Sequence, residues 1–267
     1  MAALSVISLG QRDYAEMAAF QETLVFRRLA GEIGDVLLIL EHPPTYTLGR
    51  RAEPSDLLHD DGWYRQRGIV VRETPRGGKV TYHGPGQLVV YPVVDLSRLG
   101  RQPVAARKVD IRGFVEALER SMSETLQHLG INSGSIEGLT GLWVDDDRKS
   151  PRDFTGAQAG DAAAGLAAGR IRKIGSIGLK IHRGISSHGL SLNVSCDLDP
   201  FDWINSCGIE SCRATSIETE LGRAAPPVGV VGGLLADRIA DNLDLELRPG
   251  DPYLAEAAAT SHSDSVA

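Results

Sequence analysis

One cysteine thiol in this sequence has the setting that a nucleophile needs. Cys207 lies in a polar stretch and is followed directly by Gly208. Loop segments of this kind present side chains to substrates, whereas structural cysteines usually lie in apolar runs. A free thiol with a pKa of ~8.5 is only a few per cent ionised at neutral pH, so a nucleophilic cysteine needs a partner that favours its thiolate. The sequence therefore predicts Cys207 as the nucleophile, in preference to Cys196 and Cys212.

Lys173 offers such a partner. It opens an apolar segment interrupted by glycines, which reads KIGSIG at residues 173–178. A lysine that is partly desolvated in such a segment becomes a usable acid or base, and its ammonium favours a neighbouring thiolate. The ordinary alternative is a solvated lysine at the end of a strand. The residues alone leave both interpretations open.

A third segment is rich in glycine and reads RGGKVTYHGPGQ at residues 76–87. Its glycines let the backbone approach a ligand closely, so N–H groups can line a cleft beside the side chains of Tyr82 and His83. The alternative is a glycine-rich hairpin that binds nothing. Of the two side chains, His83 is expected to position a substrate or shape a pocket rather than to act as the main base.

Several common catalytic and cofactor motifs are absent from the sequence. It contains no GxxxxGK[ST] phosphate loop, no GxGxxG after a strand, no GxSxG and no HExxH. Cys207 and Cys212, with His182 and His188 upstream, do not match a common zinc spacing. We therefore expect neither a metal ion nor a cofactor.

The composition narrows the class of protein further. The chain has 267 residues and a formal net charge of −7, which disfavours a general nucleic-acid binder. No apolar run approaches the ~20 residues that span a bilayer, and no secretory signal is visible. Three cysteines without a CxxC pair favour a reducing compartment. We expect a cytoplasmic monomer that binds neither nucleic acid nor membrane.

A mixture of helices and strands must position these side chains. Helical spacing predicts helices over residues 13–31, 107–129 and 228–243, and apolar runs predict strands at 36–40, 69–71, 88–91, 142–144, 171–182 and 188–194. Because the order lacks a regular βαβ alternation, an α+β fold is favoured. We expect one catalytic domain over residues 1–248 with a flexible insert at 145–170, followed by a disordered tail at 249–267.

Taken together, the motifs resemble those of the lipoyl(octanoyl) transferase family, within the superfamily of biotin and lipoate protein ligases. The segments that carry this resemblance are EHPPTYTLGR at 41–50, RGGKVTYHGPGQ at 76–87, TGLWV at 140–144, KIGSIG at 173–178, SHGLSLNV at 187–194 and NSCG at 205–208. Two departures stand out. Ser206 replaces the proline that usually precedes the cysteine, and the insert at 145–170 is longer than the family requires.

The resemblance implies an α+β fold of mixed, mainly antiparallel sheets flanked by helices, similar to biotin protein ligases and to class II synthetase cores. It implies a catalytic dyad of Cys207 and Lys173. It also implies a pocket for the acyl group that is lined by Arg76, Gly77, Gly78, Lys79, Val80, Thr81, Tyr82, His83, Ser176, Ile177, Gly178, Gly189, Leu190 and Ser191.

The implied reaction moves an octanoyl or lipoyl group from acyl carrier protein, through a thioester on Cys207, to a lysine of a lipoyl domain or of a glycine-cleavage carrier protein. Three alternatives are an ATP-dependent lipoate or biotin ligase on the same scaffold, a catalytically silent acyl-binding or regulatory module, and a cysteine hydrolase. Because the chain is acidic while acidic protein partners are expected, we also expect a local basic rim formed by Arg50, Arg51, Arg76, Lys79 and Arg183.

Overall fold

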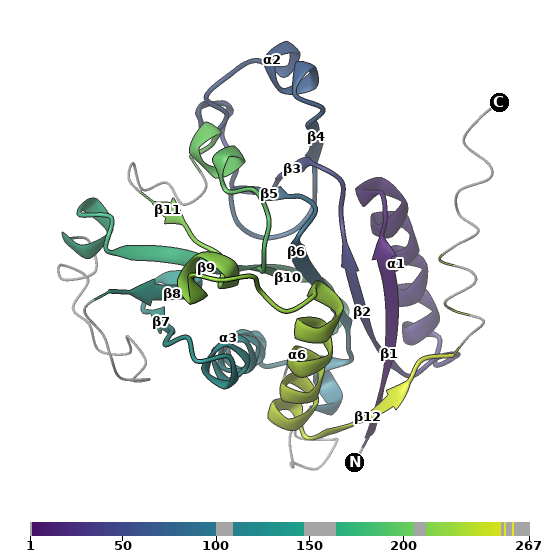
Figure 1. Cartoon of the computed structure of the whole chain (residues 1–267). Coiled ribbons are helices and arrows are strands. Elements are labelled where there is room, and N and C mark those ends of the chain that lie inside the picture. The colour runs from purple at the N-terminus through teal and green to yellow at the C-terminus, as the bar shows by residue number, and fades with distance from the viewer. Residues whose placement is uncertain are drawn as a thin grey trace.

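The larger of two sheets forms the centre of the molecule (Figure 1). The computed structural model describes residues 2–99, 109–146, 164–205 and 212–251, together with Leu254 and Ala258. Within these residues the larger sheet has nine strands in the order β12-β1-β2-β6-β10-β9-β8-β7, with β11 paired to β9. Its strands are β1 (Ala2–Gln11), β2 (Asp35–Glu41), β6 (Gln87–Val93), β7 (Gly134–Ile136), β8 (Leu139–Asp145), β9 (Ile171–His182), β10 (Ile185–Asn193), β11 (Arg213–Ala214) and β12 (Leu245–Pro249).

The smaller sheet contains three strands of the described chain, in the order β4-β3-β5. They are β3 (Thr45–Leu48), β4 (Val70–Glu73) and β5 (Val80–His83). Short helical turns accompany this sheet: α2 (Asp61–Gln66), a 3-10 turn at Pro54–Asp56 and another at Asp199–Trp203. An aromatic cluster that includes Tyr46, Tyr64, Tyr82 and Phe201 packs beneath it.

Helices cover both faces of the larger sheet. On one face, α3 (Ile111–His128) and α6 (Val228–Leu243) pack together against the sheet. On the other face lies α1 (Tyr14–Leu29). Strand β2 shows the alternation directly, because Leu37 and Ile39 belong to the first cluster while Leu38 and Leu40 belong to the second. The short helix α5 (Ile217–Leu221) follows β11.

The fold class predicted from the sequence is confirmed. The β1–β2 and β1–β12 pairs are parallel, as are β3–β4 and β9–β11, while the remaining pairs of the two sheets are antiparallel. The three predicted helices are present, and Gly130, with φ +86°, follows the end of α3. No helix in the described part of the chain is long and apolar enough to cross a membrane.

The end of β6 differs from the sequence prediction. Strand β6 does not end before Pro92 but continues to Val93, and Pro92 pairs with Leu37 of β2. On the other side of β6, the ladder with β10 runs only from Gln87 to Val90. Pro92, which has no N–H to donate, therefore lies beyond the end of that ladder.

The expected flexible insert and disordered tail also need correction at their ends. Asp145 belongs to β8, and the segment from residue 164 to 170 packs Leu166 against Trp143 and Ile171. Pro249 belongs to β12, and the Gly250 N–H donates to the Val6 carbonyl. Leu254 and Ala258 are buried against the α1 face. Residues 147–163 and 259–267 lie outside the described residues.

Candidate active site

A cavity with a volume of about 240 Å³ lies between the two sheets. Thirteen of the sixteen predicted site residues line it: Arg76, Gly78, Lys79, Val80, Thr81, His83, Lys173, Ser176, Ile177, Gly178, Gly189, Leu190 and Ser191. Two others, Gly77 and Tyr82, are not among its lining residues. Cys207 lies outside the described residues.

The pairing of β9 with β10 explains why two distant motifs meet at this cavity. Ser176 lies opposite Ser191, Ile177 opposite Leu190, and Gly178 opposite Gly189. At Gly189 a Cβ atom would overlap the Val90 carbonyl oxygen of β6, so the strand needs glycine at this close approach. The two glycine-bearing strands together form one wall of the cavity.

Arg76 is held inside this wall rather than at its edge. Its side chain is only 7% exposed and donates to both oxygens of Thr47 and to the Gly77 carbonyl at 2.8 Å. Burial lowers the pKa of its guanidinium. A Cβ at Gly178 would lie 3.0 Å from the Arg76 Cδ, and the Gly77 N–H donates to the Leu179 carbonyl. Gly77 thus joins the glycine-rich segment to β9 from behind the cavity.

The predicted basic rim is wrong for two of its members. Arg76 is buried, as described above, and Lys79 Nζ lies 3.1 Å from the buried carboxylate of Asp56 and 3.8 Å from Glu53. Arg51 does line the cavity, but Arg50 and Arg183 are not among its lining residues. The positive charges are therefore not gathered into one free rim.

Lys173 lies at the end of the cavity where β8 and β9 pair. Its Nζ is 5.0 Å from the centre of the Trp143 ring, which is a cation–π contact. A Cβ on Gly141, whose φ is +119°, would lie 2.9 Å from Lys173 Cε. The glycine of the TGLWV segment therefore leaves the space in which the lysine side chain lies.

The described residues on either side of 206–211 are both fixed near this end. On one side, the Asn205 N–H donates to the Asp56 carbonyl at 2.8 Å, and Ile204 forms a β-bridge with Leu57. On the other side, Cys212 and Ala214 line the cavity, and Ala214 pairs with Lys173. The predicted dyad thus has one member inside the cavity and one in the segment between these two anchors.

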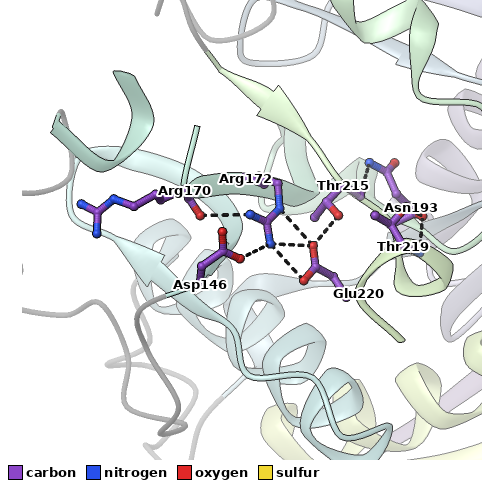
Figure 2. A network of polar contacts seen from close by, with 8 residues as sticks. Asp146, Arg170, Arg172, Asn193, Thr215, Thr219 and Glu220 are labelled. Atoms are coloured by element: carbon purple, nitrogen blue, oxygen red, sulfur yellow. Dashed lines mark hydrogen bonds and ion pairs between the residues drawn. The ribbon is translucent and has the colours of Figure 1, made fainter. Parts of the chain in front are cut away.

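An ion-pair network holds β11 and the residues that follow it against β9 (Figure 2). Arg172, next to Lys173, contacts both carboxylate oxygens of Glu220 at 3.0 and 3.1 Å and Asp146 at 2.7 Å. The Thr215 hydroxyl also donates to Glu220, and the Thr215 N–H donates to the Lys173 carbonyl at 2.9 Å. Charge and backbone contacts therefore fix β11 beside the lysine.

A chain of directed hydrogen bonds fixes His83. Asn193 Nδ2 donates to the Thr215 carbonyl, so its Oδ1 is left to accept from Gln87 Nε2 at 2.9 Å. Gln87 Nε2 also donates to the Tyr82 carbonyl, so its Oε1 must accept from His83 Nδ1 at 2.7 Å. Burial lowers the pKa of His83 to about 3, so the ring is neutral. Its proton is on Nδ1, and Nε2 keeps a lone pair.

Several cavity residues were not among the predicted site residues; of these, Tyr14, Tyr91 and His188 belong to one buried aromatic group, whereas Trp143 lies against Lys173. Tyr14 contacts His188 through Oη and Nδ1 at 3.4 Å, and Tyr91 and Trp143 also line the cavity. His188 lies inside the SHGLSLNV segment, which was quoted without assigning it a role. Tyr14 and Tyr91 carry no motif, because they reach the site from α1 and β6 through tertiary packing. In the part of the chain that the structure describes, no group of three or more His, Cys, Asp or Glu side chains is arranged to hold a metal ion.

Comparison with known proteins assigns the family. Residues 13–235 match the family model described as the lipoyl protein ligase A/B catalytic domain. An octanoyltransferase of Chloroflexus aggregans is 39% identical over 250 residues, covering 93% of this chain and 98% of the relative. An octanoyltransferase of Mycobacterium sp. strain KMS is 36% identical over 261 residues, covering 96% and 94%.

The chain belongs to the family of the lipoyl protein ligase A/B catalytic domain. It is an enzyme of the octanoyltransferase group, and the resemblance inferred from its motifs is confirmed. Among solved structures, a bipartite lipoate protein ligase from Thermoplasma acidophilum matches with a TM-score of 0.67 and 13% identity, covering 97% of this chain and 91% of that one. A lipoate-protein ligase A bound with ATP matches with a TM-score of 0.61 and 14% identity, covering 97% and 92%. At such low sequence identity, the matches to these two ligases show a shared fold and nothing more.

Proposed function

We propose that this octanoyltransferase moves the octanoyl group from acyl carrier protein to a lysine of a lipoyl domain or of a glycine-cleavage carrier protein, through a thioester on Cys207. The observation that carries the proposal is the position of Lys173. Its amine lies inside the cavity against Trp143, and β11, which follows the Cys207 segment, pairs with β9 at Lys173 itself.

In the first half-reaction the Cys207 thiolate attacks the carbonyl carbon of the donor thioester. A lysine ammonium nearby favours the thiolate over the thiol. The bond between carbon and the donor's sulfur then breaks, and the leaving thiolate takes a proton from Lys173. The products are an acyl-enzyme and a neutral lysine amine.

In the second half-reaction the acceptor lysine, as a neutral amine, attacks the acyl-enzyme. Lys173, now neutral, takes the proton that the attacking nitrogen loses, as a general base. The carbon–sulfur bond to Cys207 breaks and the thiolate–ammonium pair is restored. Thioester-to-thioester exchange is nearly neutral in energy and thioester-to-amide transfer runs downhill, so the cycle needs no ATP.

Both half-reactions pass through an oxyanion that needs hydrogen-bond donors. Of the two adjacent glycines in the RGG segment, Gly77 already donates its N–H to Leu179. Gly78 lines the cavity but lies beside Arg76, at the end away from Lys173, so neither glycine is placed to serve an acyl carbonyl near Lys173. Removing one such donor typically costs ~2.7–4 kcal/mol of transition-state stabilisation in other enzymes.

The main alternative is an ATP-dependent ligase on the same scaffold. The ATP-bound ligase cited above shares the fold, but such an enzyme activates a free acid and needs no nucleophilic cysteine. We further propose that the transferase acts as a monomer in the cytoplasm, where acyl carrier protein and the acceptor domains would meet it.

The experiment that tests this function is intact-protein mass spectrometry after mixing the chain with octanoyl–acyl carrier protein in the absence of ATP. We expect an octanoyl adduct on the unmodified enzyme, no adduct on Cys207→Ala, and slow formation on Lys173→Ala. Cys196→Ala is the matched control, because Cys196 is buried outside the cavity. Transfer that appears only with ATP and free octanoate would replace this proposal by the ligase.

A further inference from the structure

The end of the cavity opposite Lys173 is polar, although the expected substrate is a hydrocarbon chain. Gly178 lies five positions beyond Lys173 on β9, but the end of the Lys173 side chain lies beside the Gly175 carbonyl. Three residues separate Gly175 from Gly178, or ~10 Å at ~3.3 Å per residue, which is about the length of an extended eight-carbon chain. Arg76 packs on Gly178, and His188 directly precedes the paired Gly189. The distal carbons of an acyl chain whose carbonyl lies near Lys173 therefore point toward this end, which we call the polar recess: Tyr14, Arg76, His83, Tyr91 and His188.

The rings around this recess form one packed group. The Tyr14 and His83 rings stack with centres 6.1 Å apart, and the His42 ring lies 5.7 Å from His83 and 5.8 Å from Tyr91. His42 itself is fully buried behind the recess. The orientation of each polar atom is therefore set by neighbours that have little room to move.

The hydrogen bond between His42 and Tyr91 has a fixed direction. His42 Nδ1 lies 2.7 Å from the Arg12 carbonyl, which can only accept, so Nδ1 carries the proton. Burial lowers the pKa of His42 to about 4, so the ring is neutral and Nε2 accepts. The Tyr91 hydroxyl, 2.7 Å from Nε2, must therefore donate to it. The hydrogen of the Tyr91 hydroxyl is therefore bound to His42, and the lone pairs of its oxygen can still accept a hydrogen bond.

Two residues that line the cavity thus offer acceptors with fixed orientation. One is Nε2 of His83, whose proton is held on Nδ1 by Gln87, and the other is the Tyr91 oxygen. A terminal methyl group would cover these acceptors and satisfy neither, which costs free energy. A hydroxyl hydrogen would satisfy one of them.

We propose that the polar recess is a subsite for a hydroxyl group at the distal end of the acyl chain, so that the enzyme also accepts medium-chain ω-hydroxyacyl donors. The inference rests on the acyl transfer proposed above and deepens it by naming a substrate class. A water molecule held above the methyl end of octanoate is the competing occupant of the same acceptors.

The test compares 8-hydroxyoctanoyl– and octanoyl–acyl carrier protein as donors for the full-length enzyme. The measured quantity is the ratio of kcat/KM for the two donors in the unmodified enzyme and in Tyr91→Phe, which keeps the ring and removes the oxygen. Tyr46→Phe is the matched control, because Tyr46 is equally buried and donates to the Pro200 carbonyl outside the cavity. Titration calorimetry with the two free acids gives the same ratio for binding alone.

We expect Tyr91→Phe to lower the hydroxyoctanoyl-to-octanoyl ratio about tenfold, and Tyr46→Phe to leave it unchanged. A ratio that is the same in all three proteins would overturn the subsite and leave water as the occupant. If no transfer occurs with either donor, the proposed function fails, while the calorimetric ratio still decides whether the recess binds the hydroxyl.

Discussion

The two ends of the cavity solve different problems. Around Lys173 the side chains are held by charge and by close backbone contact, through Trp143, Gly141 and the Arg172–Glu220 pair. In the polar recess, neutral histidines and tyrosines are held by directed hydrogen bonds inside an aromatic group. In the proposed reaction, Lys173 at the first end carries the proton that moves. At the second end the hydrogen-bond directions fix the protons, which suits the recognition role proposed above.

The largest effect is expected when the Lys173 amine is removed from the reactive end of the cavity. Lys173→Met keeps most of the length and the apolar part of the side chain but removes the amine and its cation–π contact with Trp143. We expect kcat/KM for octanoyl transfer to fall by roughly 10²–10⁴, the usual contribution of a general acid–base. Thermal unfolding serves as the control for the fold. Retention of more than a tenth of the activity would mean that Lys173 is not the proton carrier.

The buried histidines in and behind the polar recess predict how the free energy of unfolding depends on pH. Burial lowers the pKa of His42 and of His188 to about 4, and of His83 to about 3. Because these values lie below the ~6.5 of an unfolded histidine, the unfolded chain binds more protons, and the free energy of unfolding falls as pH drops from 6.5 toward 4. Each histidine contributes a slope on the order of 1.4 kcal/mol per pH unit.

Urea unfolding at several pH values between 7 and 4 measures that slope. His188→Asn is the informative variant, because His188 has φ +54° and asparagine tolerates the left-handed region. We expect a shallower slope in the variant. Parallel slopes for the variant and the unmodified protein would assign the acid sensitivity to other groups.

A smaller effect is expected where glycine makes room for the lysine. In Gly141→Ala the new Cβ would press on Lys173 Cε and on the Gly175 carbonyl. We expect a stability loss of about 1–3 kcal/mol and roughly a tenfold loss of transfer rate. Gly130→Ala is the control, since Gly130 also has positive φ, with nothing within 4 Å of its Cβ position. Similar activity losses in both variants would point to backbone strain alone.

The smallest effect concerns the ion pair behind the reactive end. Glu220→Gln removes the charge that Arg172 contacts, while Asp146 remains as a second partner. Removing one partner of a fully buried pair costs about 3–5 kcal/mol. Since these side chains are 18% and 13% exposed, we expect about 1–2 kcal/mol in urea unfolding. Arg112→Gln, which breaks an exposed pair with Glu116, is the control and should change little. An equal loss in the two variants would argue against the network as the support of β11.

The sequence predicted part of each end of the cavity. Motif order identified Lys173 at the first end, and Arg76, His83 and the paired glycines Gly178 and Gly189 at the second, because close backbone approach leaves glycine at fixed spacings. Cys207 remains a prediction, since it lies outside the described residues. Tyr14 and Tyr91 were not predicted, because their roles depend on contacts between α1, β6 and the His42 segment, which no local pattern encodes.

The same distinction holds for the fold. Long apolar runs and helical stripes predicted the central strands and the three long helices. Strands β1 and β12 were not predicted. Their apolar residues alternate only weakly, and each is defined by a partner far away in the sequence, as Ala2 is by Leu245. A local sequence pattern indicates which residues are buried, whereas the pairing of β1 with β12 depends on the tertiary fold.

That pairing has a consequence for how the chain is made. Strand β1 has β2 on one side and β12 on the other, and β12 begins only at Leu245. Synthesis proceeds from the N-terminus, so one edge of β1 stays unpaired until the chain has been synthesised beyond Leu245. An open edge is a template for pairing with other chains. A nascent or truncated chain that stops before Leu245 therefore carries an adhesive edge that the finished protein covers.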